Sequence, residues 1–327
     1  MKYKSNKILV PAMFSLFATG CAAMTTNGLN GTKVSVCVVD DEGLPINEVH
    51  TEIFEFHDFN SPFGFTDNNG LYSGYIKNIY SAIGGVFEKE GYYKTIGSFW
   101  RWKEWEKVPP SSTNFTIVMK RIINPVPIKT KEVSLFFPQF ETPFGFDYEI
   151  GDWIFPNGKG KVEDMRLTLS GRYSSKSDYD MTMLVAFPDG HDGMQPFFVP
   201  PEDGSGLLHS KLPPPQIAPD SGYARTLERF TRLQPPNRRG YSSYDATKRW
   251  IFRTRTAVDD KGDIIAANYG WTTTDMIFAP GKGVGNIRFT YYYNPDPHSR
   301  SLEPKEIADQ QAKEFAETMR RLDDAKK

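Results

Sequence analysis

Apolar and polar residues alternate along most of this chain, which is the pattern expected of β-strands with one buried face. Short alternating segments recur from residue 33 to residue 293, and glycine-containing turns separate them. Their apolar members are Val34, Val36 and Val38; Phe115, Ile117 and Met119; Met165, Leu167 and Leu169; Met181, Met183, Val185 and Phe187; Trp250 and Phe252; and Ile287, Phe289, Tyr291 and Tyr293. This pattern predicts an all-β protein with an N-terminal sandwich and a larger antiparallel sandwich or barrel.

Residues 188–221 interrupt the alternation. This stretch contains eight prolines and several glycines and shows no sustained period. Loops longer than about 12–15 residues are uncommon and are usually functional or disordered. We therefore expect a long loop here, and we expect an active site under it if the protein is an enzyme.

The C-terminal end changes to a helical pattern. Its apolar residues recur at steps of four and three, and Pro304 suits the first turn of a helix. They are Ala308, Ala312, Phe315, Met319 and Leu322. We expect a short amphipathic helix over residues 303–325 that docks on the second β domain, with partner binding as the alternative use of its apolar stripe.

The N-terminus has the order of an export signal. Lys2, Lys4 and Lys7 precede an apolar run over residues 8–18, and small residues follow up to Cys21. A cysteine after small residues resembles a bacterial lipobox, in which the cysteine is acylated and becomes the new N-terminus. The resemblance implies a protein that Cys21 anchors to a membrane. Ala22 follows instead of an aspartate, which by the rule of that family favours the outer membrane and leaves the leaflet open.

These patterns divide the chain into five parts. Residues 1–20 are the signal peptide, and residues 21–32 are the acylated cysteine and a small, polar tether. Residues 33–121 form the first β domain and residues 129–300 the second, with the stiff Asn124–Pro127 stretch between them. The helix over residues 303–325 completes the chain.

Three motifs in the first β domain resemble carboxypeptidase regulatory-like domains, which have a transthyretin-like fold. Val34 to Ile46 resembles the opening strand and its Asp-x-x-Gly-x-Pro turn, and Thr66 to Tyr72 is similar to the Thr-Asp-x-x-Gly turn. Glu88 to Tyr93 looks like the Gly-Tyr element, whereas the stretches at 54–65 and 99–105 depart from the family. The resemblance implies a seven-strand sandwich that serves as a non-catalytic accessory module. The second domain resembles no family that we recognise.

The net charge and the cysteine content bear on the expected partners and on the state of Cys37. The net charge is −1, without the basic excess of a nucleic-acid-binding protein, so nucleic acid is not an expected partner. Cys37 is left as a lone thiol once Cys21 is acylated, and an unpaired thiol in an exported protein is usually buried. We therefore expect an inert, buried Cys37 on the first strand.

Local motifs for catalysis are missing from the sequence. The five histidines show no zinc-protease spacing, and the glycine-rich stretches fit neither a nucleophile elbow nor a phosphate loop. The loop from Asp189 to Gly193 holds two carboxylates and an imidazole, but these residue types are also those of an ordinary turn. We expect no catalytic residue, no metal and no cofactor from local sequence.

Two aromatic or basic stretches are the candidate ligand sites. Trp100 and Trp102 could stack on sugar rings, although packing inside the protein is the alternative. Residues 225–255 hold nine basic residues interleaved with aromatic ones, and Arg253 and Arg255 are the candidates for an anionic glycan or lipid headgroup. The alternative is that these basic residues lie on a solvated face and that acidic residues elsewhere balance their charge.

Together the patterns predict a non-enzymatic, lipid-anchored protein of the cell envelope. Its role would be binding or assembly, with an envelope protein or an anionic glycan as the partner. The alternative is an envelope hydrolase that acts on glycan or peptide, with its site near residues 188–221. Convergent carboxylates or a perturbed histidine in a pocket would favour the hydrolase.

Overall fold

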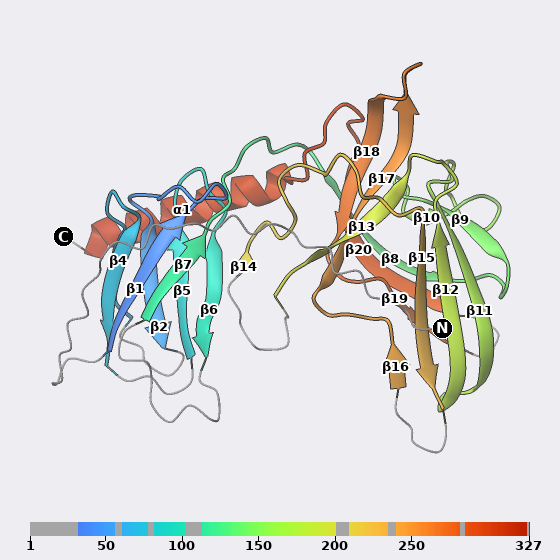
Figure 1. The fold of residues 1–327 in the computed structure, drawn as a ribbon, viewed down its shortest axis with the longest axis horizontal. Helices are drawn as coiled ribbons and strands as arrows, with labels where there is room; N and C mark the ends of the chain where they lie inside the picture. The colour runs from blue at the N-terminus through green and yellow to red at the C-terminus, as the bar shows by residue number, and fades with distance from the viewer. Residues whose placement is uncertain are drawn as a thin grey trace, which may run out of the picture.

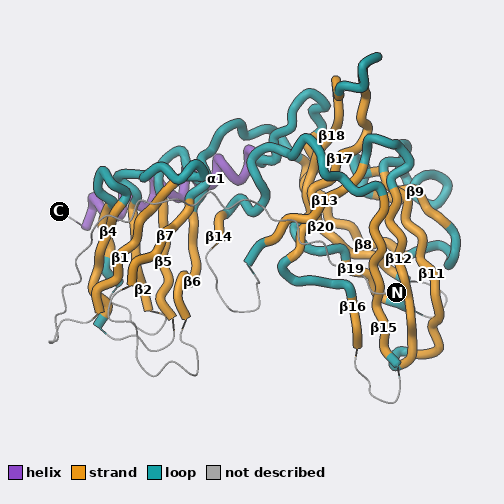
Figure 2. Tube along the Cα trace, viewed as in Figure 1, coloured by secondary structure: helices purple, strands orange, loops and turns teal. Residues whose placement is uncertain are grey.

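The computed structural model describes residues 32–55, 61–77, 82–101, 113–200, 209–234, 240–281, 285–325 and 327. Over these ranges the chain folds into β-strands arranged in four sheets and a single C-terminal helix (Figure 1). Figure 2 shows the strands in orange and the helix α1 in purple. The predicted all-β class with a terminal helix is confirmed.

The N-terminal strands form two sheets that face each other. The strands are β1 (Thr32–Val39), β2 (His50–Glu55), β3 (Phe63–Phe65), β4 (Leu71–Ile76), β5 (Ala82–Glu88), β6 (Thr95–Arg101) and β7 (Thr113–Val118). One sheet has the order β4-β1-β7, in which β7 is parallel to β1. The other has the order β14-β6-β5-β2-β3 and takes its edge strand, β14 (His209–Ser210), from much later in the chain.

The core of this first sandwich follows the alternation of the sequence. Val34, Val36 and Val38 are fully buried and pack with residues of the facing sheet, Ile53, Ile83 and Phe87. Two of the sequence motifs contain turns: Asp40 accepts hydrogen bonds from the N–H groups of Glu42 and Leu44, and Gly70 adopts a φ of 72°.

The prediction of a buried thiol at Cys37 is wrong. Cys37 lies on the face of β1 opposite to Val36 and Val38, because successive side chains of a strand point to opposite faces. It is only half-buried, and its Sγ lies 3.9 Å from the carbonyl oxygen of Asn69. Partial burial, with Asp67 nearby, raises the pKa of the thiol and keeps it protonated at neutral pH.

The second sandwich consists of two larger sheets. The first has the order β10-β9-β11-β12-β15-β16, and the second has the order β13-β17-β18-β20-β19, with β8 paired to the other side of β20. The bounds are β8 (Lys129–Phe136), β9 (Pro143–Asp147), β10 (Asp152–Trp153), β11 (Met165–Ser175), β12 (Asp178–Ala186), β13 (Gly193–Phe198), β15 (Thr226–Leu233), β16 (Gly240–Ser242), β17 (Lys248–Val258), β18 (Ile264–Thr272), β19 (Ile277–Ala279) and β20 (Asn286–Asn294).

Alternating apolar residues from both sheets fill the space between them. The predicted rows on β11, β12, β17 and β20 are all buried there. At the centre, the ring of Tyr148 stacks on Phe252 with 4.0 Å between centroids, and Tyr291 donates a hydrogen bond to the carbonyl of Tyr148. The apolar area that these sheets remove from water is the main stabilisation of the domain.

Residues 188–221 differ from the predicted loop. They contain the edge strand β13, which pairs with β17 so that Pro196 lies opposite Trp250. Proline lacks the N–H that an interior strand must donate, but an edge strand tolerates it. The same stretch then supplies β14, whose His209 and Ser210 pair with Ile96 and Thr95 of the first sandwich.

Residues 209–220, which we call the junction segment, join the two sandwiches. Lys120, at the end of the first sandwich, donates from Nζ to the carbonyl oxygens of Leu212, Pro213 and Pro214 at 3.0, 3.0 and 2.7 Å. Gln216 donates to the Asp41 carboxylate at 2.7 Å. The partners are 92 to 175 residues apart in sequence, so these bonds fix the junction segment to the first sandwich.

A second connection lies beside the first. The buried carboxylate of Glu303 accepts hydrogen bonds from the N–H groups of Ile123 and Asn124, and Ser301 Oγ donates to the carbonyl of Asn124 at 2.6 Å. Leu302 packs with Trp271 in a small apolar cluster of the second sandwich. The chain leaving the second sandwich is therefore held against the chain leaving the first.

The C-terminal helix α1 (Lys305–Ala325) lies against the first sandwich, so its predicted docking on the second domain is wrong. Ala308 packs with Tyr93 and Leu212, and Gln311 Oε1 accepts a hydrogen bond from the N–H of Lys94 at 2.9 Å. Figure 1 shows α1 along the ends of β4, β1 and β7. The apolar stripe is only partly covered, since Ala312 is exposed.

Candidate binding end of the second sandwich

Polar loops gather at one end of the second sandwich, which we call the loop end. They follow β9 at Asp147–Glu149, precede β11 at Asp164, and follow β12 at Pro188–Asp192. Strand β17 brings Arg253 and Arg255 to the same end, where both bond to these loops. The predicted ligand residues Arg253 and Arg255 therefore lie together, close to the start of the 188–221 stretch.

Arg255 lies in a bulge of β17, where the pairing with β18 shifts between Thr254 and Ala257. Its φ is 55°, a left-handed conformation that a bulky residue adopts only when its surroundings impose it. The Asp192 carboxylate supplies that constraint, since it accepts hydrogen bonds from the N–H groups of Arg255 and Thr256 at 2.9 and 3.1 Å. The bulge turns the side chain of Arg255 toward the loops.

The guanidinium of Arg255 then contacts three carboxylates. Its Nε lies 2.8 Å from Asp164, Nη1 lies 2.8 Å from Glu149, and Nη2 lies 2.9 Å from Asp147. The side chain of Arg255 is 22% exposed, and those of Asp147 and Asp164 are nearly fully buried. This cation therefore holds the Asp147–Glu149 loop and the segment at Asp164 together.

The acidic partners of Arg255 have shifted pKa values in opposite directions. Burial raises the pKa of Asp164 in spite of its bonds to Arg255. Burial also acts on Asp147, but N–H donors from Lys161, Val162 and Ile150, aided by Arg255, bring its pKa below the usual range. Hydrogen bonds from Arg255 and Lys129 lower the pKa of Glu149. Each shift has an internal cause, so these groups serve the structure of the loop end.

Arg253 is buried and holds two further loops. It donates to the carbonyl oxygen of His191 through Nε at 2.8 Å and to that of Asp220 through Nη1 at 3.0 Å, and it lies over the ring of Tyr223. The Asp189–Gly193 stretch forms a turn in which Asp189 accepts a hydrogen bond from the N–H of His191 at 2.7 Å. No group of histidine, cysteine, aspartate or glutamate within the described ranges is arranged to hold a metal ion.

Most other cations of the predicted basic stretch also have internal partners. Arg229 forms a buried ion pair with Asp275, Arg232 pairs with Asp180 at 2.8 Å, and Arg249 donates to the carbonyl oxygen of Ala246 at 2.8 Å. Arg238 and Arg239 lie outside the described residues. Arg229 and Arg249 are buried, and Arg232 is neutralised by an exposed carboxylate, so these three cations do not form a continuous basic surface.

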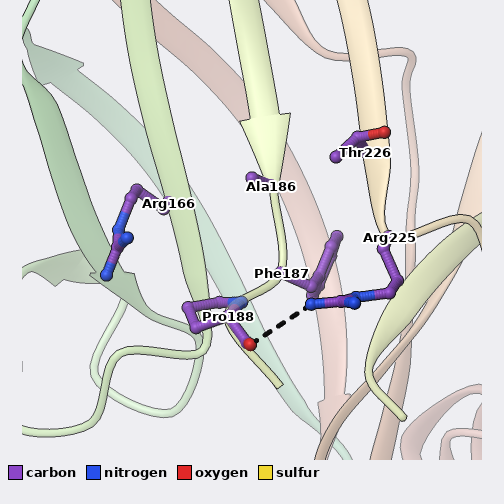
Figure 3. A pocket seen from close by; sticks show the side chains of 6 residues that line it. All are labelled: Arg166, Ala186, Phe187, Pro188, Arg225 and Thr226. Atoms are coloured by element: carbon purple, nitrogen blue, oxygen red, sulfur yellow. Dashed lines mark hydrogen bonds between the residues drawn. The ribbon is translucent and has the colours of Figure 1, made fainter. Parts of the chain in front are cut away.

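An open pocket of 440 Å³ lies at this end, on the outer face of the β11-β12-β15 sheet. We call it the arginine pocket, and its lining residues are Arg166, Ala186, Phe187, Pro188, Arg225 and Thr226. Figure 3 shows the guanidinium of Arg225 reaching toward Pro188 and Arg166 on the far side of the opening. The dashed line is the 3.5 Å hydrogen bond from Arg225 Nη2 to the Pro188 carbonyl.

The remaining predicted site residues do not join this end. Trp100 is part of β6 in the first sandwich, where its backbone lies opposite Ile83, whereas Arg253 and Arg255 belong to β17. Cys21, Trp102 and the tether up to residue 31 lie outside the described residues. The sequence reasoning missed Arg166, because its membership of the pocket depends on strand register and not on neighbours in sequence.

Comparison with known proteins identifies no family, since no family model and no curated protein matches the chain. Among solved structures, a 3-chlorocatechol 1,2-dioxygenase from Rhodococcus opacus 1CP matches at 15% identity and a TM-score of 0.21, over 28% of this chain and 60% of the enzyme. The shaft pilin spaA from Lactobacillus rhamnosus GG matches at 13% identity and a TM-score of 0.19, over 73% and 92% of the two chains.

A streptococcal ancillary pilin matches at 11% identity and a TM-score of 0.19, over 65% of this chain and 59% of the pilin. These likenesses are too remote to support an argument about activity. Within the described ranges, no helix combines the length and the apolar character that crossing a membrane requires.

Proposed function

We propose that this chain is a cell-envelope lipoprotein, acylated at Cys21 and held in the outer membrane, that acts by binding or assembly and not by catalysis. The lipobox-like sequence before Cys21 supports the anchor. The motifs shared with carboxypeptidase regulatory-like domains support an accessory role for the first sandwich. An envelope protein or an anionic glycan is the proposed partner.

The observation that carries this proposal is the use of residues 188–221. From the sequence, a hydrolase site was expected near this stretch if the protein is an enzyme. Its described residues instead form strands β13 and β14 and the junction segment. Three consecutive carbonyls of the junction segment, from Leu212 to Pro214, receive the Lys120 ammonium. A segment that joins two domains in this way supports a role in holding the body rigid.

The carboxylates of the loop end also favour a binding role over hydrolysis. A general acid or base must reach the proton that it transfers in a bound substrate. Asp147, Asp164 and Asp192 are nearly fully buried, and their oxygens accept hydrogen bonds from Arg255 or from backbone N–H groups. These carboxylates are placed to fix the loops.

In-cell crosslinking of the full-length protein, followed by mass spectrometry, tests the proposal. A photo-crosslinking residue at the exposed Tyr241 is compared with one in a Cys21→Ser variant, which lacks the acylation site. We expect the labelled protein with Cys21 to be acylated and to form a stoichiometric adduct with a protein or a glycan. We expect the Cys21→Ser variant to show neither. Hydrolysis of envelope glycan or peptide by the purified protein, or an unacylated Cys21, would contradict the proposal.

A further inference from the structure

We propose that the arginine pocket binds the carboxylate or phosphate group of an acidic saccharide. Arg225 would receive the anion, and Ala186, Pro188 and Thr226 would accommodate the adjoining sugar, whereas Arg166, whose guanidinium is bound to Glu163, borders the far side of the opening. The inference rests on the proposed binding role and names a ligand class and a site for it. It does not depend on Arg253 and Arg255, which are committed to internal contacts.

Strand register builds the pocket. Arg166 on β11 lies opposite Ala186 on β12, and Ala186 lies opposite Thr226 on β15. The three residues therefore form one row across neighbouring strands, about 4.8 Å apart in the direction of the hydrogen bonds. The alternate residues Leu167 and Val185 point into the core, so the row faces outward. The small side chain of Ala186 between Arg166 and Thr226 leaves the hollow.

The position of Arg225 is fixed by its backbone. The N–H of Phe187 donates to the carbonyl of Arg225 at 2.9 Å. The neighbouring Ala224 exchanges two hydrogen bonds with Met194 of β13, at 3.0 and 2.9 Å. Arg225 is thus held at the start of β15 between two strands, and only its side chain must be ordered when a ligand binds. Such preorganisation lowers the cost of binding.

The lining of the pocket contains two arginines and no carboxylate, and of the two only Arg225 is available to an anion. Arg166 pairs with Glu163 through Nε and Nη2, at 2.9 and 2.5 Å, which orients the guanidinium. Arg225 has no carboxylate partner among the described residues, and its contact with the Pro188 carbonyl is long, at 3.5 Å. An arginine free of carboxylates presents a planar fork that matches a carboxylate or a phosphate.

Size and the remaining lining indicate a saccharide. A volume of 440 Å³ falls within the range of small-ligand sites, about 300–1,000 Å³. The Thr226 hydroxyl both donates and accepts hydrogen bonds, which suits a sugar hydroxyl. The ring of Pro188 offers an apolar face next to the cations (Figure 3). These features together favour an acidic sugar over a bare inorganic anion.

Calorimetric titration of the purified full-length protein tests the site. The probes are tri-galacturonic acid and glucose 6-phosphate as the two anion types, maltotriose as the neutral sugar, and inorganic phosphate. We expect one binding site for at least one acidic sugar, weaker binding of phosphate, and no binding of maltotriose. Affinity should fall as salt is raised, because a charged contact is screened.

Variants at the pocket and a matched control complete the test. Arg225→Gln should weaken binding of the acidic sugar about tenfold or more, the loss expected for one charge-assisted hydrogen bond. Ala186→Leu should fill the hollow and also weaken binding. Arg232→Gln removes an arginine from the same strand, where it pairs with Asp180, and should leave the affinity unchanged.

The outcomes separate this inference from the proposed function. Absence of acidic-sugar binding by the purified protein, or equal binding by wild type and Arg225→Gln, overturns the pocket assignment. Equal loss with Arg232→Gln also overturns it, since that result shows nonspecific charge attraction. Unchanged melting temperatures of the variants exclude unfolding as the cause. The in-cell adduct that depends on Cys21 is a separate readout of the envelope role.

Discussion

At the scale of single residues, the loop end depends on one cation in an unusual backbone conformation. Arg255 has a φ of 55° and contacts three carboxylates, of which two are almost fully buried. Removing one partner from a buried ion network leaves uncompensated charge, which costs much more than losing an exposed pair. The left-handed conformation is maintained because Asp192 and the carboxylates act on the same residue.

We predict that Arg255→Gln lowers the free energy of unfolding by about 3 kcal/mol, the order found when a buried pair is broken. Urea denaturation followed by tryptophan fluorescence measures this change. Arg172→Gln is the matched control, because Arg172 pairs with Asp178 on the exposed surface, where water screens the pair, and its loss should change the free energy of unfolding much less. Equal effects of the two substitutions would contradict the role given to Arg255.

Lys120 allows a prediction about pH. Burial lowers its pKa to about 8, although Asp41 acts in the opposite direction. The folded protein then releases this proton near pH 8, and the unfolded chain releases it near pH 10.4. Between these values the unfolded state binds more protons, so the free energy of unfolding gains a contribution that rises with pH.

The test compares wild type with Lys120→Met in urea denaturation at pH 7, 8, 9 and 10. The contributions of all other groups are shared by the two proteins, so their difference isolates Lys120. We expect the stability of wild type relative to the variant to increase from pH 8 to pH 10. A difference that stays flat or falls over this range would show that the Lys120 site does not disfavour the charged form.

At the scale of elements, alternation in the sequence predicted the long strands well and the short ones poorly. The rows on β11, β12, β17 and β20 are buried as predicted, because each strand has one face in an apolar core. Strand β13 was missed because of Pro196, which an edge position tolerates. Strand β14 has two residues, too few for a period, and its partner β6 is more than a hundred residues away.

The candidate site was only partly predictable, for a related reason. A concentration of arginines marked residues 225–255, but sequence does not show which carboxylates or carbonyls lie opposite them. Arg253 bonds to two carbonyls and Arg255 to three carboxylates, whereas Arg225 has only a long contact with the Pro188 carbonyl within the described chain. Arg166 entered the pocket through its pairing with Ala186, which depends on register.

Close approach of β18 to its neighbours leads to a prediction at Gly270. A Cβ at this position would lie 2.2 Å from the carbonyl oxygen of Tyr292 and 2.3 Å from the ring of Phe252. Gly270→Ala should therefore lower the free energy of unfolding by about 3 kcal/mol through overpacking. At Gly240 the nearest atom would be 3.8 Å away, so Gly240→Ala should change it by about 0.5 kcal/mol or less. Thermal denaturation measures both variants. Equal shifts in their melting temperatures would refute this packing.

The position of α1 gives a further prediction. Truncation after Pro304 removes the acceptor Gln311 and uncovers Tyr93 and Leu212. In hydrogen exchange, the N–H of Lys94 and the backbone around Leu212 should lose protection, because their stability depends on the helix. The paired strands β11 and β12 should keep their protection. A loss of protection confined to the second sandwich would instead indicate that the helix docks on that domain, as the sequence suggested.

At the scale of the whole molecule, the contacts between the two sandwiches make them one body. Domains of one chain move relative to each other unless the interface between them is extensive. Here the connection includes the β14–β6 pairing, the three carbonyl bonds of Lys120, and the bonds of Glu303 to Ile123 and Asn124. A rigid body of this kind would hold the loop end at a fixed distance from Thr32, the first residue of β1.

A distance measurement between the sandwiches shows whether they move as one body. Spin labels at the exposed positions Tyr75 on β4 and Leu184 on β12, with Cys21 and Cys37 changed to serine, report the separation by pulsed electron resonance. We predict one narrow distance distribution, which broadens when Lys120→Met and Glu303→Gln are combined. A broad or multiple distribution in the protein without these two changes would contradict the account, because the sandwiches would then move independently.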